Sequence, residues 1–288
     1  MSIEEKNQLG QFIPLHYHFQ MLSDSHRIRS FKSAIERIVK AHHNVVELGS
    51  GTGVLSFFAA KQGANVQSIE FNPDLVTASK QFLEQNGVGD KVEVIEADAS
   101  HWVPSEPVDV VVCEMLHSAL LREKQVQVIE SFRNNHKEKF GTIPIMIPSA
   151  TLLGVQPVMQ NYLFEGYHAA VPLFQSPYVI SEETQEIIDP EVYQIIDYNN
   201  AKVETYSCTA SFSFNQASKF NAFRFITRNL LAIDQHGTDM VDWHSQYLVI
   251  PAPSVVEVEE GQDVSVTFSY SPGDPIESLS NTLEISIQ

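Results

Sequence analysis

The sequence contains few cysteines and no long apolar run. Its two cysteines, Cys113 and Cys208, lie far apart and form neither a CxxC pair nor a zinc-ligand pattern. This usage excludes a disulfide scaffold, fits a reducing compartment and predicts no metal site. No run approaches the roughly 20 apolar residues of a membrane span, and residues 1–8 lack the basic and apolar regions of a signal peptide. We therefore expect a cytoplasmic protein with no membrane partner.

Basic residues are also scarce, because 18 lysines and arginines face 36 aspartates and glutamates, for a net charge of −18. Residues 151–288 carry 4 basic and 18 acidic side chains, a balance of −14. Such a surface repels phosphate backbones and lacks the basic stripe of a nucleic-acid binder. It attracts cationic substrates over long range, although a need for solubility would account for the charge equally well. We therefore do not expect a nucleic-acid partner.

The most informative stretch is residues 45–56, VVELGSGTGVLS. An apolar β-branched run reaches Glu47, a glycine-rich turn follows, and an amphipathic segment begins after the turn. This order predicts a strand, a tight turn and a helix. Glycines allow positive φ and remove Cβ atoms that would block a ligand at the helix N-terminus. The turn contains Gly49, Ser50, Gly51 and Gly53.

A second predicted strand, residues 65–70, ends on Glu70 about 20 residues after the glycines, where nucleotide-binding βαβ units place a carboxylate for the ribose hydroxyls. An ordinary strand-turn-helix with incidental glycines is the alternative. Together, Glu47, the GxGxG turn and Glu70 resemble the class I S-adenosylmethionine-dependent methyltransferases. The resemblance implies S-adenosylmethionine as cofactor, with Glu70 accepting from its ribose hydroxyls and Glu47 beneath its methionine amino end.

Two further strands are predicted between Glu70 and the loop that holds the candidate catalytic residues. Residues 91–99 read as a strand that ends at Asp98, which either starts a turn or, as the resemblance implies, meets the adenine amino group of the cofactor. Residues 108–114 are so uniformly apolar that we expect a central parallel strand buried on both faces. The carboxyl end of such a strand lies beside the ligand crevice of an open α/β sheet.

Two glutamates, Glu114 and Glu123, flank an apolar loop at this end and resemble the paired-glutamate loop of the protein arginine N-methyltransferases. The His-x-x-Met-Leu-x-Asp-x-x-Arg signature of that family is matched by His18, Met21, Leu22, Asp24 and Arg27. The resemblance implies that Arg27 binds the methionyl carboxylate and that His18 and Met21 line the cofactor site. Glu114 and Glu123 would clamp a guanidinium bidentately. A solvated glutamate at a helix start is the alternative for Glu123.

The sequence departs from the family pattern in two places. The Thr-His-Trp loop of the family stands here as Val241-Asp242-Trp243, so Trp243 matches as a substrate-binding residue and Asp242 replaces the histidine. That histidine pairs in the family with the aspartate matched by Asp24, and a second carboxylate would not replace the contact. His244 could swing into the place of that histidine, but as a lone histidine beside an apolar strand it is expected to be structural. The N-terminal Tyr-Phe-x-x-Tyr element is missing, and Phe12 is the nearest aromatic residue.

The length of 288 residues allows one large or two medium domains. A helix is expected over residues 23–40, capped by Ser23 or Asp24. Beyond Pro148 the sequence reads as β, with strands expected at 205–214, 220–226, 247–250, 264–270 and 283–287. The family resemblance implies a β-barrel here, with a dimerisation arm over residues 161–179. We predict an α/β fold with a Rossmann-like methyltransferase domain over residues 1–148, followed by an all-β, barrel-like domain over residues 149–288.

We therefore predict an S-adenosylmethionine-dependent methyltransferase that acts on a cationic acceptor, such as arginine in a basic peptide or protein. Two alternatives stay open. The same scaffold could methylate a small molecule, such as a cationic one, or RNA. The chain could also be an inactive scaffold that only binds the cofactor. A homodimer is the expected assembly.

Overall fold

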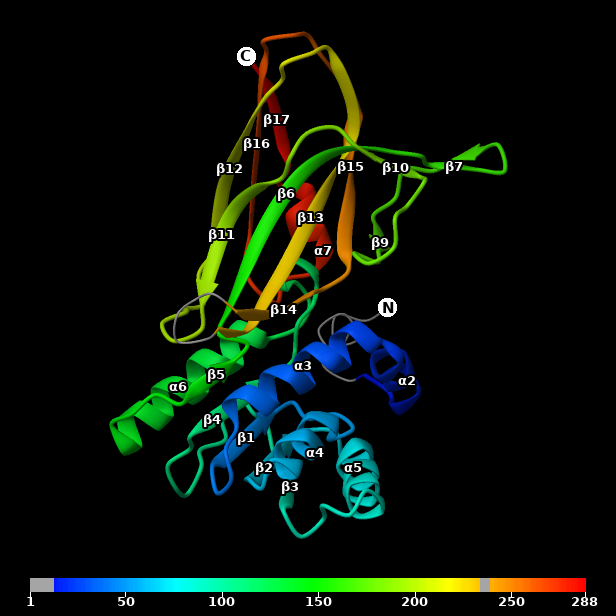
Figure 1. Cartoon of the computed structure of the whole chain (residues 1–288). Coiled ribbons are helices and arrows are strands. Elements are labelled where there is room, and N and C mark those ends of the chain that lie inside the picture. Colours follow the sequence, from blue (N-terminus) through cyan, green and yellow to red (C-terminus); the bar gives the residue numbers. More distant parts are fainter. Residues whose placement is uncertain (1–12, 234–238) are drawn as a thin grey trace.

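The computed structural model describes residues 13–233 and 239–288. Figure 1 shows a helix-covered parallel sheet in the lower half and antiparallel strands in the upper half. Phe12, named above as the nearest aromatic residue to a missing family element, lies outside the described residues. Among the described residues, no helix combines the length and the apolarity needed to cross a membrane.

The parallel sheet has five strands in the order β3-β2-β1-β4-β5. β4 is buried along its whole length between β1 and β5, as the uniformly apolar run predicted. Helix α4 packs on β1 and β2, and α5 packs on β2 and β3. The strands are β1 (Asn44–Leu48), β2 (Asn65–Glu70), β3 (Val92–Glu96), β4 (Val110–Cys113) and β5 (Ile145–Ile147), and the helices are α4 (Val54–Lys61), α5 (Pro73–Gln85) and α6 (Gln125–Phe140).

In the part of the chain that the structure describes, two helices precede this sheet where the sequence predicted one. Helix α2 (Leu15–Ser23) and helix α3 (Ser25–Ile38) meet at Asp24, which has an extended backbone. The carboxylate of Asp24 accepts a hydrogen bond from the Arg27 N–H at 3.0 Å and so caps α3. Helix α2 buries no residue, so its sequence lacks the strong apolar periodicity by which a helix is recognised.

Among the described residues, the second half of the chain forms two larger antiparallel sheets and a two-stranded hairpin, and strands occur at each of the stretches expected there. A seven-stranded sheet is built on β6, β13 and β15, and a three-stranded sheet contains β12, β16 and β17. The bounds are β6 (Ala150–Gln160), β9 (Leu173–Gln175), β10 (Thr184–Glu186), β11 (Glu191–Asp197), β12 (Tyr206–Ser213), β13 (Ser218–Ile233), β14 (Met240–His244), β15 (Tyr247–Val258), β16 (Asp263–Tyr270) and β17 (Glu284–Ile287).

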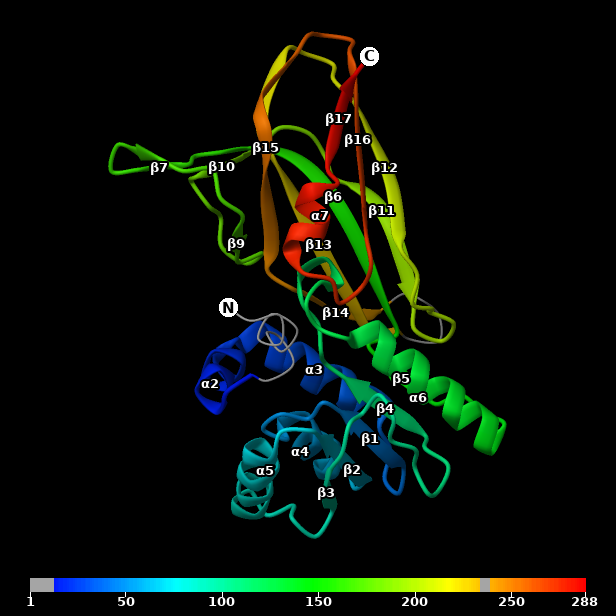
Figure 2. The same cartoon turned by 180° about the vertical axis from the view of Figure 1, so that it is seen from behind.

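Figure 2 shows the strands of the two larger antiparallel sheets facing each other. Aromatic side chains pack between these sheets. The ring centroids of Tyr193 on β11 and Phe268 on β16 are 4.9 Å apart, and those of Phe225 on β13 and Phe268 are 5.2 Å apart. No strand pairing joins the two sheets in the part of the chain that the structure describes. A closed barrel therefore stays a prediction.

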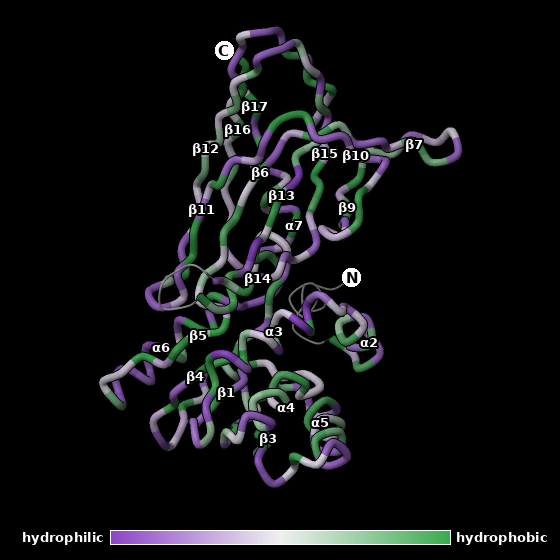
Figure 3. Tube along the Cα trace, in the orientation of Figure 1, coloured by the Kyte–Doolittle hydropathy of each residue, from purple (hydrophilic) through white to green (hydrophobic). Residues whose placement is uncertain are grey.

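The parallel and antiparallel parts share one continuous core of buried apolar residues. The chain passes from one to the other between Ile147 and Ala150, and the predicted division at 148 and 149 falls in this connection. The buried guanidinium of Arg133 on α6 donates to the carbonyl oxygens of Tyr198 at 3.0 Å and Ala201 at 2.7 Å, which ties the two parts together. Turns at the far ends of the molecule are mostly hydrophilic (Figure 3).

A short hairpin of β7 (Leu163–Phe164) and β8 (Tyr167–His168) projects from the antiparallel part (Figure 1). Its apolar side chains are exposed, with Leu163, Phe164 and Tyr167 at 56%, 51% and 73%. The hairpin lies within residues 161–179, the stretch predicted to be a dimerisation arm.

Candidate active site

A cavity of about 310 Å³ opens at the carboxyl ends of β1, β2 and β4, beneath α2 and α3. This is the edge at which open α/β sheets bind ligands. Gly53 lies outside the lining, at the start of α4 with φ 78°, where an added Cβ would lie 3.2 Å from Leu83 Cδ1. The other predicted site residues all line the cavity: His18, Met21, Arg27, Glu47, Gly49, Ser50, Gly51, Glu70, Asp98, Glu114, Glu123 and Trp243.

The glycine-rich turn is in close contact with the residues on the other side of the cavity. Gly49 and Gly51 have φ values of 70° and 55°, which favour glycine. A Cβ on Gly51 would lie 2.7 Å from His18 Cε1, and one on Gly49 would lie 2.9 Å from Met115 Sδ. Larger residues at these two positions would push His18 and Met115 out of place.

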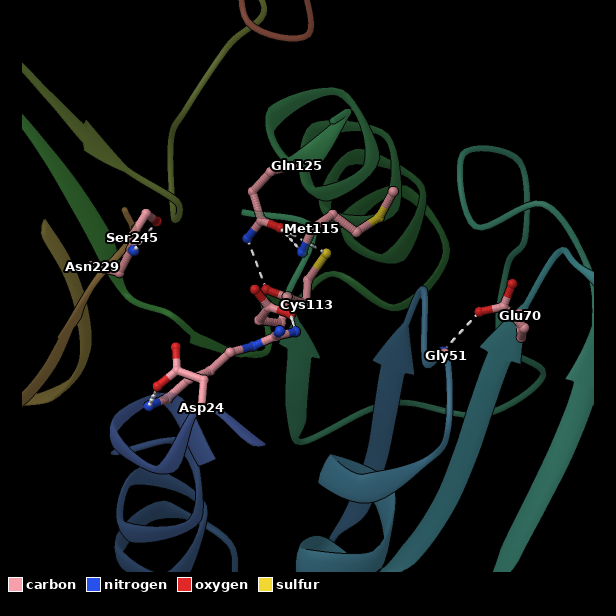
Figure 4. A network of polar contacts seen from close by, with 10 residues as sticks. Asp24, Gly51, Glu70, Cys113, Met115, Gln125, Asn229 and Ser245 are labelled. Atoms are coloured by element: carbon pink, nitrogen blue, oxygen red, sulfur yellow. Dashed lines mark hydrogen bonds and ion pairs between the residues drawn. The ribbon is translucent and has the colours of Figure 1, made fainter. Parts of the chain in front are cut away.

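Glu70 ends β2 with its carboxylate fixed over the turn. Its two oxygens accept from the N–H groups of Gly51 and Asn72, each at 2.8 Å (Figure 4). The side chain is buried against the cavity. Its position, about 20 residues after the glycines in sequence, suits acceptance from the ribose hydroxyls of a nucleoside.

Three buried polar atoms of cavity-lining residues have no hydrogen-bond partner among the described residues: His18 Nε2, Ser50 Oγ and Trp243 Nε1. Buried polar groups are almost always paired in folded proteins. Burial, together with the charge of Arg27, lowers the pKa of His18, so its neutral ring can both donate and accept. The cavity therefore fits a ligand with several polar atoms, as S-adenosylmethionine has.

Glu47 is the deepest carboxylate of the site, with 3% of its surface exposed. It accepts from the Ser56 N–H at 2.8 Å and from the Ser56 hydroxyl. Burial raises the pKa of Glu47 to about 7, although both bonds from Ser56 oppose that shift. A cationic group bound nearby would favour the charged form. Ser56 was not predicted as part of the site.

Asp98 fits the turn that the sequence offered as one of its two roles, and its contact with an adenine amino group stays a prediction. It lines the cavity, and it also starts a turn in which its carboxylate accepts from the Ser100 N–H at 2.8 Å and lies 3.1 Å from His101 Nδ1. Burial acts to raise the pKa of Asp98, but the hydrogen bonds from Ser100 and His101 outweigh it and lower the pKa. Asp98 is therefore an ionised acceptor at the cavity rim.

Arg27 and Glu114 form an ion pair across the cavity, through Nη2 of the arginine and Oε2 of the glutamate. Both side chains are largely buried, with 17% and 9% exposed. The Arg27 guanidinium also lies 5.8 Å from the centre of the Trp243 ring. A guanidinium has five N–H donors, so Arg27 retains donors for a ligand carboxylate while one of them holds Glu114.

Glu123 faces the same cavity, unlike the solvated glutamate of the alternative interpretation. Burial raises the pKa of Glu123 to about 7, against the charges of Arg27 and Arg122, which lower it. The cavity therefore holds two acidic side chains from one loop, one paired with Arg27 and one close to half-ionised at neutral pH. A cationic ligand between them would stabilise both as carboxylates.

The loop between these glutamates is strained and contains the short 3-10 helix η1 (Ser118–Leu120). Ala119, Leu120 and Arg122 have φ values of 55°, 56° and 66°, in a region that is unfavourable for residues other than glycine. Such conformations persist where the surroundings hold them.

Four contacts with the antiparallel part hold this loop. The Ala119 N–H donates to Thr227 Oγ1 at 2.7 Å, and the Ser118 hydroxyl donates to the Gln246 carbonyl at 2.5 Å. The Leu120 carbonyl accepts from the Gly273 N–H at 2.8 Å. The Arg122 N–H donates to the Asp274 carbonyl at 2.8 Å. Each of these contacts uses at least one backbone group, and a backbone group leaves no signal in the sequence.

Gln125 was also missed. It opens α6 with a fully buried side chain that bonds to the backbone on both sides of Glu114. The available signal was a polar residue in line with the buried face of the helix, which continues through Ile129, Phe132 and His136.

The sequence predicted that Asp242 would not form the contact with Asp24 that the histidine of the family makes. The residues around Trp243 show which contacts are present instead. Asp242 accepts from Arg228 Nε at 2.5 Å and lies 3.9 Å from His244 Nε2. Besides the direct contacts of α3 with β14, one link between them runs through Tyr178, whose hydroxyl accepts from the His244 N–H at 3.0 Å and whose ring stacks on His26 at 3.9 Å. Trp243 lines the cavity, and its predicted contact with a substrate stays a prediction.

Comparison with known proteins agrees with this geometry. Residues 45–139 match the family model described as a methyltransferase domain. An uncharacterised protein of Methanocaldococcus jannaschii is 29% identical over 265 residues, which cover 91% of this chain and 95% of that protein. An arginine N(omega)-methyltransferase of Streptomyces achromogenes is 32% identical over 142 residues, 48% of this chain and 38% of that enzyme. The chain spans half or less of the length of the curated arginine methyltransferases that it matches.

Among solved structures, the Trypanosoma brucei PRMT1 enzyme-prozyme heterotetrameric complex with AdoHcy superposes with a TM-score of 0.71 at 16% identity. The match covers 94% of this chain and 96% of that chain. At this identity the likeness shows the fold, a parallel sheet followed by antiparallel sheets.

Proposed function

The chain is an S-adenosylmethionine-dependent methyltransferase that resembles the protein arginine N-methyltransferases, and we propose that its acceptor is the guanidinium group of arginine in a basic protein or peptide. One observation carries the proposal. Glu114 and Glu123, at the two ends of one strained loop, line the same cavity as the Arg27 that pairs with Glu114.

The cofactor supplies an electrophilic methyl group on its sulfonium. Glu70 would accept from its ribose hydroxyls, and the free donors of Arg27 would bind its carboxylate. His18 and Ser50 would gain the partners that they lack among the described residues. Glu47 would lie beneath its amino group, whose charge favours the ionised glutamate.

A guanidinium is a poor nucleophile because its lone pairs are delocalised. Glu114 and Glu123 would accept from its N–H groups, align the attacking nitrogen and draw positive charge away from it. Methylation leaves one proton to be lost from the product. Glu123, whose pKa burial raises to about 7, is suited to accept that proton at neutral pH.

Free arginine is a second candidate acceptor. The Streptomyces relative that supports it is named as an arginine N(omega)-methyltransferase, and its match with this chain spans 142 residues. A free amino acid would use the same two glutamates but would need no surface for a peptide.

The experiment supplies labelled S-adenosylmethionine to the purified chain together with an arginine-rich peptide, free arginine or total RNA. Amino-acid analysis of the product should recover methylarginine. Label in RNA or in an unrelated small molecule would support the other acceptors on this scaffold. Cofactor binding without transfer to any of them would identify an inactive scaffold.

Glu114→Gln should lower kcat by about 100- to 1000-fold, because one of two groups that stabilise the developing charge is removed. Affinity for S-adenosylhomocysteine, measured by calorimetry, should change little, because Glu114 is assigned to the acceptor. Glu93→Gln, at an exposed carboxylate on β3, is the matched control. Unchanged transfer by the Glu114 variant would remove the paired-glutamate mechanism.

A homodimer in the cytoplasm is part of this proposal. The exposed apolar hairpin of β7 and β8 and the exposed Phe19 on α2 offer surfaces that a second copy would cover. Sedimentation should give twice the chain mass, and Phe164→Asp should halve it. A wild-type monomer at micromolar concentration would contradict the proposed assembly.

A further inference from the structure

The side chain of Gln125 is enclosed beneath Glu114, at the start of α6. Its Nε2 donates to the Cys113 carbonyl at 2.8 Å, and its Oε1 accepts from the Met115 N–H at 2.8 Å (Figure 4). The same oxygen accepts from Cys113 Sγ at 3.3 Å. The peptide groups on both sides of Glu114 are therefore held by one amide.

This amide supports the chain where the sheet no longer does. Cys113 is the last residue of β4 that pairs with β1, and Met115 lies beyond it. The orientation of the amide is defined, because the flipped form would place two N–H donors against each other at Met115. Neither a shorter nor an apolar side chain can make both bonds.

Gln125 also stands close to the second glutamate in the chain, two residues after Glu123. Its backbone begins the helix that follows Glu123, while its side chain holds Glu114. The strained loop between the glutamates is thus closed at its base by one residue.

We propose that Gln125 is a positioning residue that sets the spacing and direction of Glu114 relative to Glu123. The identity of the acceptor in this statement rests on the proposed function. A guanidinium presents its N–H groups in a rigid fork, so it can bond to both carboxylates only at a fixed spacing. Without the amide, Glu114 would follow a mobile strand end, and the acceptor nitrogen would no longer be aligned.

The test compares Gln125→Leu and Gln125→Glu with Gln127→Glu. Gln127 lies on the same helix and also donates to a backbone carbonyl, that of Pro272, but it does not touch the residues beside Glu114. Gln125→Leu should lower kcat by about 100-fold, the cost of misplacing reacting groups by about 1 Å. Its affinity for S-adenosylhomocysteine should stay close to that of the wild type.

Gln125→Glu keeps the shape and provides a conditional rescue. A protonated glutamic acid can donate to one backbone group and accept from the other, whereas a carboxylate cannot donate. Its activity relative to wild type should be high at low pH and fall as pH rises. The surrounding ionisable groups, Cys113, Glu114, Glu123, Tyr198 and Arg27, are present in both proteins, so the ratio isolates the new acid.

Crystal structures with S-adenosylhomocysteine decide the matter without an activity measurement. Glu114 should keep its pairing with Arg27 in the wild type and lose it in Gln125→Leu. An unmoved Glu114, or a kcat for Gln125→Leu equal to that of Gln127→Glu, would overturn the proposal. If the wild type transfers no methyl group to arginine, the proposed function fails. The two crystal structures would still show whether Gln125 positions Glu114.

Discussion

At the scale of single residues, the carboxylates of the cavity differ because their surroundings differ. Burial raises the pKa of Glu47 and of Glu123 to about 7. Hydrogen bonds from Ser100 and His101 lower the pKa of Asp98. The same chemical group therefore serves as a proton acceptor near neutral pH in one place and as a permanent anion in another.

This difference predicts a pH dependence of transfer. Glu123 must be ionised to hold a guanidinium, so kcat/KM, which reports the pKa values of the free enzyme, should rise with pH through about 7. Glu123→Gln should lose both the activity and the rise, whereas Glu93→Gln should keep them. Initial rates at low peptide concentration between about pH 5 and 9, an interval of about two units on each side of that pKa, measure this. A rate independent of pH across this range would show that Glu123 does not titrate there.

Glu47 and Glu123 also affect the stability of the fold, and rising pH should lower this stability although it raises activity. Their pKa values lie near 4.5 when unfolded and about 7 when folded, so between these values the folded chain binds more protons. The free energy of unfolding should therefore fall as pH rises across this interval, by about 1.4 kcal/mol per pH unit for each such group. Urea unfolding of the cofactor-free chain at a series of pH values tests this. The free energy of unfolding should fall less steeply with pH for Glu123→Gln than for the wild type. A slope equal to wild type would contradict the prediction.

At the scale of elements, the site depends on a loop that belongs to one part of the chain and is held by another. Ala119, Leu120 and Arg122 adopt left-handed backbone conformations that their own sequence disfavours. Bonds from β13 and from the segments around Gln246 and Gly273 stabilise them. The antiparallel part is therefore a support for the acceptor site as well as a neighbouring unit.

Thr227→Val should reveal this support. The variant keeps the shape of a fully buried side chain but removes the hydroxyl that accepts from the Ala119 N–H. We expect a loss of about 1–3 kcal/mol in the free energy of unfolding, because a buried donor is left unpaired. We also expect lower kcat with unchanged cofactor affinity. Thr227→Ser, which keeps the hydroxyl, should restore both, and equal kcat values for the two variants would refute the role.

At the scale of the whole molecule, the net charge of −18 acts on the approach of the acceptor. Residues 151–288, which form the antiparallel part, carry most of this charge. A negative surface attracts cationic partners over a distance set by the screening length of the solution. Salt shortens this length from about 10 Å at 0.1 M to about 3 Å at 1 M.

The KM for an arginine-rich peptide should therefore rise with salt concentration, with a smaller effect on kcat. Affinity for S-adenosylhomocysteine should depend weakly on salt, because that ligand is close to neutral, and it serves as the control. Methyl-transfer rates in increasing sodium chloride test the prediction. A KM that salt leaves unchanged would restrict the acidic charge to a role in solubility.

The sequence by itself determined the parallel sheet, its glycine turn and the residues at the carboxyl ends of its strands. These follow from short-range rules: apolar runs form buried strands, glycines allow tight turns, and Glu70 follows the turn at a set spacing. Only the tertiary structure decided how Glu114 is held by Arg27 and Gln125, and how Tyr178 links His26 to His244. These contacts join residues from separate elements, and many use backbone groups that every residue type carries, so no local pattern records them.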